Sequence, residues 1–126
     1  MLNFKAKHPD AQGGSALLEA MIAILVFSFG ILGLIGLQAT SMKVTTAAKD
    51  RIDASLVANS YVAAMWADWK NLGDYAEDKK DISAATGLPE ATRTTVVNGN
   101  QVTVTIAWKS PAGDGKYETS AQIIGN

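Results

Sequence analysis

The chain has 126 residues, a formal net charge of −1 and no cysteine. This length allows one small folded domain and a long helical segment, but not two domains. A weakly acidic chain without a basic run argues against nucleic acid as the main partner. The lack of cysteine excludes disulfides and thiolate metal ligands.

The first fourteen residues are polar and end in the pair Gly13–Gly14. They contain no apolar pattern from which a core could form, so we expect a flexible segment. His8, the only histidine of the chain, lies within it. A protein that loses this segment has neither His nor Cys, which excludes Ser-His-Asp and Cys-His catalysis and a His- or Cys-ligated zinc.

An apolar run follows, and from Ala20 to Leu37 it contains no charged residue. As a helix this stretch would be ~27 Å long, close to the ~30 Å hydrocarbon thickness of a bilayer. Length and composition therefore predict a helix that spans a membrane.

Glu19 lies just inside this run, where a carboxylate is costly in a membrane. It comes four residues after Ser15 and therefore lies on the same helical face. If the chain is cut between Gly14 and Ser15, the new α-amine lies one turn from Glu19. That amine can then pair with the carboxylate of its own chain or of a neighbour. The alternative is a boundary residue that reaches the headgroups or is favoured there by the helix dipole.

The apolar run contains three glycines spaced three residues apart, Gly30, Gly33 and Gly36. Small residues on one face allow a second helix to approach closely. Each glycine also weakens a helix by nearly 1 kcal/mol relative to alanine, which predicts a local bend or partial melting. Both interpretations suit a helix that exchanges lipid for other helices.

The helix is predicted to extend from about residue 16 to about residue 71, where Lys70–Gly73 provides a stop signal. Residues 43–71 have an amphipathic pattern with one face for a core. The expected core face comprises Ala48, Ile52, Leu56, Val62, Ala63 and Trp66. For Trp66 and Trp69 we expect core packing rather than a ligand platform.

Residues 73–91 form a polar connection in the predicted structure. Its acids, Asp74, Glu77, Asp78 and Asp81, raise the question of calcium. Their spacing is not that of an EF-hand, and a Lys-Lys pair lies among them. We therefore expect a solvated loop and no metal.

The C-terminal part is predicted to form three strands, at about residues 92–97, 101–109 and 116–124. Asn98-Gly99 is a strong signal for a two-residue hairpin. Strict alternation places one apolar set on a shared face: Val102, Val104, Ile106 and Trp108. Tyr117, Thr119, Ala121 and Ile123 share a side of the third strand. The predicted fold is α+β, with the C-terminal half of a long helix packed on a three-stranded antiparallel meander.

A short hydrophilic segment ending in Gly14, an acid at the fifth position after it and a long apolar helix together resemble the class III signal of type IV pilins and type II secretion pseudopilins. The resemblance covers residues 12–40. Within this group, Ser15–Glu19 and Phe27–Ala39 are most similar to minor pilins of the PilV type. The family usually has Phe or Met where this chain has Ser15, and many members have a proline near the position of Gly36.

The resemblance implies a pilin-like structural subunit, not an enzyme, with no cofactor. Residues 1–14 would be the leader, residues 15–42 the transmembrane and filament-core half of the helix, and residues 43–126 the globular head. A prepilin peptidase would cut between Gly14 and Ser15 and methylate Ser15. Glu19 would pair with the N-terminal amine of an adjacent subunit and set the axial register of assembly.

The resemblance also implies a location and a set of partners. Before assembly, the chain would cross the inner membrane once with its head in the periplasm; afterwards it would lie in a pilus at the cell surface. Its partners would be other major and minor pilins, prepilin peptidase, the inner-membrane assembly platform and the lipid bilayer. The expected roles are pilus assembly, adhesion and twitching motility.

Two alternatives stay open at this point. A type II secretion pseudopilin has the same N-terminal chemistry as a type IV pilin. A single-pass membrane-anchored binding domain would have an intact N-terminus, or a cut after the apolar run, and a pocket in its head. For catalysis the sequence offers no phosphate loop, no metal-ligand cluster and no nucleophile with a base, so no catalytic residue is expected.

Overall fold

The computed structural model describes residues 1–2 and 13–125. It consists of two units, Met1–Thr40 and Ser41–Asn126, which share one continuous helix, α1 (Gly13–Ala67). Most of the expected leader, residues 1–14, lies outside the described residues. In the first unit, the described residues after position 12 all belong to α1.

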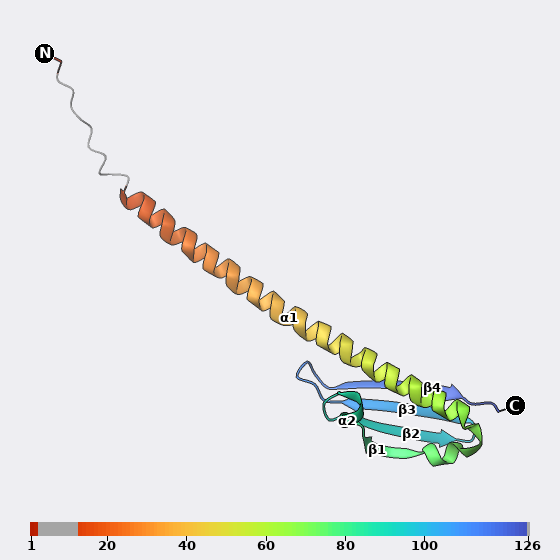
Figure 1. Cartoon of the computed structure of the whole chain (residues 1–126). Helices are drawn as coiled ribbons and strands as arrows, with labels where there is room; N and C mark the ends of the chain where they lie inside the picture. Colours follow the sequence, from red (N-terminus) through yellow and green to blue (C-terminus); the bar gives the residue numbers. More distant parts are fainter. Residues whose placement is uncertain (3–12, 126) are drawn as a thin grey trace. The chain divides into compact units, whose positions relative to one another are not determined.

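The second unit contains the end of α1 and a four-stranded antiparallel sheet in the order β1-β2-β3-β4 (Figure 1). The strands are β1 (Glu77–Asp81), β2 (Thr92–Asn98), β3 (Gln101–Trp108) and β4 (Gly115–Gln122). The fold is therefore α+β with a long N-terminal helix packed on an antiparallel sheet, which confirms the predicted class. Three strands lie where the alternation placed them, and the sheet has one strand more than predicted.

The connection predicted as a loop over residues 73–91 is ordered, and in this respect the prediction was wrong. It contains β1 and one turn of helix, α2 (Ser83–Thr86). β1 has the sequence Glu-Asp-Lys-Lys-Asp, and its side chains are almost all exposed, so it has no apolar period that a sequence analysis could detect. It is an edge strand with a register irregularity between Glu77 and Lys80, and it pairs with β2 only.

Two acids of this connection, Glu77 and Asp81, make contacts within the fold. Both Nε and Nη2 of Arg93 on β2 donate to Glu77 Oε2, at 2.9 and 2.7 Å, and Lys80 Nζ donates to Oε1 at 2.8 Å. The guanidinium also lies 3.5 Å from the ring centroid of Tyr61 on α1. Asp81 accepts hydrogen bonds from the backbone N–H and hydroxyl of Ser83 at the start of α2. Glu77 thus ties the edge strand to β2, and Arg93 ties β2 to the helix.

We expect this network to make the second unit less stable in acid. Partial burial raises the pKa of Glu77, but hydrogen bonds from Lys80 and Arg93 outweigh it, and the net pKa lies below the ordinary 4.5. Glu77 therefore contributes stability that is fully present above pH 4.5 and is lost as the pH falls through its lowered folded-state pKa. Urea unfolding of the full chain in detergent micelles, at several pH values below 4.5, measures this loss.

Glu77→Gln is the control for this prediction. Asp81 and Glu118 also have lowered pKa values, so acid weakens the variant as well. The free energy of unfolding of the variant should nevertheless fall less steeply with decreasing pH than that of the wild type, because the variant lacks the Glu77 carboxylate. Identical slopes for the two proteins would contradict the role given to Glu77.

The helix α1 ends earlier than predicted, at Ala67, and a 3-10 helix from Trp69 to Tyr75 replaces the expected last turn. Asn71 has non-helical backbone angles, with φ −117° and ψ 34°. The Asp68 side chain accepts hydrogen bonds from Asn71 Nδ2 at 2.7 Å and from the Tyr75 hydroxyl at 3.3 Å. Such side-chain contacts compete with a continuing helix, and the tighter turn buries Leu72.

The face of α1 that packs on the sheet also differs from the prediction. The buried residues of the helix are Asp50, Ala54, Ala58 and Met65. Ile52 and Leu56, predicted for the core, are 60% and 63% exposed. The two alanines belong to the same buried core as Val102, Val104 and Ile106 of β3. Val62, which was also predicted for the core face, is partly buried and packs against this core, as does Val57.

Trp66 and Trp69 are not core residues, contrary to the prediction. They are 45% and 39% exposed. The ring of Trp69 contacts the backbone at Gly125, where an added Cβ would lie 2.2 Å from the ring, and Lys70 Nζ lies 5.3 Å from the ring centroid. The two tryptophans thus form part of the surface at the C-terminal end of α1.

The core itself follows the alternation of the strands. Val102, Val104 and Ile106 are fully buried and Trp108 is 6% exposed, which confirms their shared face. The other members of the buried core are Ala54, Ala58, Met65, Leu72, Ile82, Leu88, Ala91 and Ile123. β4 alternates between half-buried and exposed residues, as predicted, with Tyr117 and Ala121 packed against this core.

The β2–β3 hairpin is shifted by one residue from its predicted turn. Asn98 pairs with Gln101, so the two loop residues are Gly99 and Asn100. Gly99 has φ +60°, while Asn100 is not among the residues with positive φ. This combination is typical of a type II′ turn, in which glycine occupies the first central position.

Candidate functional site

The most distinctive surface of the first unit is the apolar side-chain layer of α1. All its described residues are exposed, including Phe29 at 67% and Leu32 at 68%. Within the described part of the chain, α1 is the one helix long and apolar enough to cross a membrane. The most apolar segment of this helix is not buried by the rest of the chain. The helix could therefore serve as a single membrane span.

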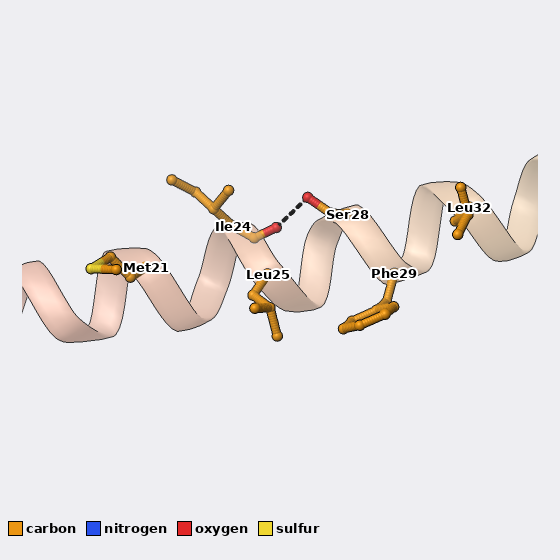
Figure 2. Close-up of a pocket in the computed structure, with 6 residues that line it drawn as sticks. All are labelled: Met21, Ile24, Leu25, Ser28, Phe29 and Leu32. Carbon is orange, nitrogen blue, oxygen red and sulfur yellow. Dashed lines mark hydrogen bonds between the residues drawn. The ribbon is translucent and has the colours of Figure 1, made fainter.

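Along one side of α1, six residues line a shallow apolar hollow (Figure 2). They are Met21, Ile24, Leu25, Ser28, Phe29 and Leu32. Ser28, the polar member, donates its hydroxyl hydrogen to the carbonyl of Ile24 at 2.7 Å. Thr40 does the same to the carbonyl of Gly36 at 3.1 Å. Because both hydroxyls are satisfied within the helix, this surface can face lipid without an unpaired donor.

Gly14, Ser15 and Glu19 all belong to the start of α1 and are exposed. Ser15 and Glu19 are separated by one helical turn and lie on the same face. Among residues 13–125, no cation forms an ion pair with Glu19. The expected partner, an α-amine at Ser15, does not exist in the uncut chain.

The three glycines of the apolar segment lie in continuous helix, without the expected melting. A Cβ added at Gly30, Gly33 or Gly36 would meet nothing within 4 Å. The chain's own fold therefore does not require glycine at any of them. Any close contact that they allow must come from lipid or from another molecule.

The described residues contain no group of three or more His, Cys, Asp or Glu side chains that could hold a metal ion. What the first unit offers is an apolar helix with a single carboxylate near its beginning. This arrangement can insert into a bilayer or pack against other apolar helices, and it can present one acid to one cation.

Comparison with models of known families, with curated proteins and with solved structures found no match.

The second unit contains a cavity that sequence reasoning missed. It lies between α1 and the turn that joins β3 to β4, and it is lined by Arg51, Trp108 and Lys116, among others. Trp108 was predicted as a core residue, and the two cations are too far apart in the sequence to form a motif. Their juxtaposition arises only from the packing of α1 across the end of β3.

Proposed function

We propose that the chain is a structural subunit of a type IV pilus, a minor pilin of the PilV type. It would enter the inner membrane through α1, lose its first fourteen residues to prepilin peptidase and join the pilus through the apolar half of α1. The observation that carries this proposal is Glu19, positioned one turn after Ser15 at the start of an exposed apolar helix.

The exposed apolar layer supports this proposal. An apolar helical segment that its own chain leaves entirely exposed needs lipid or other helices as cover. Before assembly the bilayer provides this cover, and in a filament the helices of neighbouring subunits replace it. Satisfied hydroxyls at Ser28 and Thr40 are compatible with both environments.

The pairing of Glu19 supplies the electrostatic part of the proposal. A carboxylate within an apolar bundle is strongly unfavourable unless it is paired. Cleavage before Ser15 creates a cation that an adjacent subunit can present to Glu19. The contact compensates the buried charge, and its position fixes the axial offset between subunits.

Mass spectrometry and N-terminal sequencing of the chain from host membranes test the proposal. We expect a protein that begins at Ser15 and is heavier by one methyl group. Gly14→Val should block the cut, since the class III signal ends in glycine, whereas the matched Gly13→Val variant should still be processed.

A chain that begins at Met1 in cells with an active prepilin peptidase would contradict the proposal. If the N-terminus is cut as expected, the subunits that co-purify separate the two remaining assignments. Major pilins as partners support the pilus, and secretion-system pseudopilins as partners would replace it with the type II secretion assignment.

A further inference from the structure

The cavity of the second unit has a volume of about 160 Å³. Its lining includes Arg51 on α1, Trp108 at the end of β3, Asp114 just before β4, and Gly115 and Lys116 at the start of β4. All of these residues belong to the unit Ser41–Asn126. None of them belongs to the apolar segment of α1 or to the cleavage site, because Arg51 lies further along the helix, in the second unit.

Trp108 is the buried residue of this lining. Its side chain is only 6% exposed, and the backbone of Gly115 lies against the indole, where an added Cβ would be 2.7 Å from Nε1. None of the hydrogen bonds among the described residues involves the indole N–H, nor is Nε1 among the buried atoms sealed from solvent without a partner. The indole N–H therefore has no partner among the described residues and is not fully sealed from solvent, so it is available as a donor.

Two cations accompany this donor. No described residue forms an ion pair with the Arg51 guanidinium, which has several N–H donors. Lys116 Nζ lies 3.2 Å from Glu118, but both side chains are more than half exposed, at 64% and 52%. An exposed pair of this kind contributes little, so the ammonium can turn to another acceptor.

We propose that this cavity binds a carboxylate group. The residues that line it include Trp108, Arg51 and Lys116, which carry an indole N–H and two cations as donors, and charge-assisted hydrogen bonds to a carboxylate are strong. Asp114 accepts a hydrogen bond from a hydroxyl or amide N–H next to that carboxylate. The volume is well below the ~300 Å³ of the smallest pockets for drug-sized ligands, so the ligand is a small organic acid or an acidic side chain.

The test uses the full chain in lipid nanodiscs, with its three tryptophans labelled with ¹⁵N at the indole. Trp66→Phe and Trp69→Phe assign their own signals and, by elimination, that of Trp108. The two probes are glucuronate, a small sugar acid, and glutamate blocked at both backbone ends, an acidic side chain. Glucose and blocked glutamine are their uncharged controls.

We expect a saturable shift of the Trp108 signal with at least one acid, and none with its uncharged control. The signals of Trp66 and Trp69 should stay in place. A response to glucuronate identifies a small acid as the ligand, and a response to blocked glutamate alone identifies an acidic side chain of another protein.

Arg51→Gln should weaken this binding by about tenfold or more, since it removes a charged donor. Lys109→Gln is the matched control, because Lys109 pairs with Glu90 at 3.5 Å outside the cavity, and it should bind as the wild type does. The proposal is overturned if neither acid shifts the Trp108 signal, if the uncharged controls shift it equally, or if Arg51→Gln binds as tightly as the wild type.

Discussion

Glu19→Ala is expected to leave the chain cleaved and inserted in the membrane but to reduce its incorporation into pili by about 100-fold or more. Loss of one partner from a buried ion pair costs ~3–5 kcal/mol, and each 1.4 kcal/mol corresponds to a factor of about ten. Here the unpaired group is the α-amine of the neighbouring subunit. Insertion should not suffer, because removal of a carboxylate makes the helix more apolar.

The measurement is a quantitative comparison of the subunit in the sheared pilus fraction and in the membrane fraction. Glu90→Ala is the matched control, because the Glu90 side chain is 72% exposed in the second unit and pairs only loosely with Lys109. It should assemble as the wild type does. Incorporation of Glu19→Ala at the wild-type level would remove the registry argument and with it the main support for the proposed function.

Arg93→Ala is expected to lower the free energy of unfolding of the second unit by about 3 kcal/mol. Arg93 and Glu77 are only 13% and 17% exposed, so the variant leaves a carboxylate partly buried with Lys80 alone. The variant also removes the cation from the ring of Tyr61, which couples β2 to α1.

Urea unfolding of the full chain in detergent micelles measures this effect through tryptophan fluorescence. All three tryptophans belong to the second unit, so the signal reports on that unit. Lys109→Ala removes an exposed cation and should change stability by less than about 1 kcal/mol. A double variant with Glu77→Gln should lose less than the two single losses together, because the two residues share one interaction. Strict additivity would contradict the proposed network.

The strands that carry apolar alternation could be predicted from the sequence. β3 alternates over its whole length, and its buried residues are the predicted ones. β1 could not be predicted, because an edge strand of acids and lysines has no apolar face to reveal it. It is held by backbone pairing with β2 and by the contact between Glu77 and Arg93, which are sixteen residues apart.

The helix shows why a correct element does not imply a correct face. The prediction used helical spacing and placed Ile52 and Leu56 on the side that meets the core. Ala54 and Ala58 are buried instead, in one core with the valines and the isoleucine of β3. Which apolar side of the helix faces the core depends on the space that the sheet leaves for it. The sequence alone does not give that space.

The candidate site divides in the same way. The apolar helix and its acid are local features, and they could be recognised from the order of the residues alone. The cavity between α1 and the β3–β4 turn could not be predicted from the sequence, because Arg51 and Lys116 come from distant parts of the second unit. Trp108 lines this cavity, although the alternation correctly assigns its side chain to the core.

The burial of two alanines of α1 limits which changes the second unit can accept. Ala54 and Ala58 are both 0% exposed and belong to the buried core, so a larger side chain at either position would have to displace its neighbours. Leucine and methionine have a helix propensity close to that of alanine. Either side chain would nevertheless overpack this core and lower the free energy of unfolding by about 1–3 kcal/mol. We therefore expect α1 to accept large apolar side chains at exposed positions such as Ile52 and Leu56, and not at the buried positions Ala54 and Ala58.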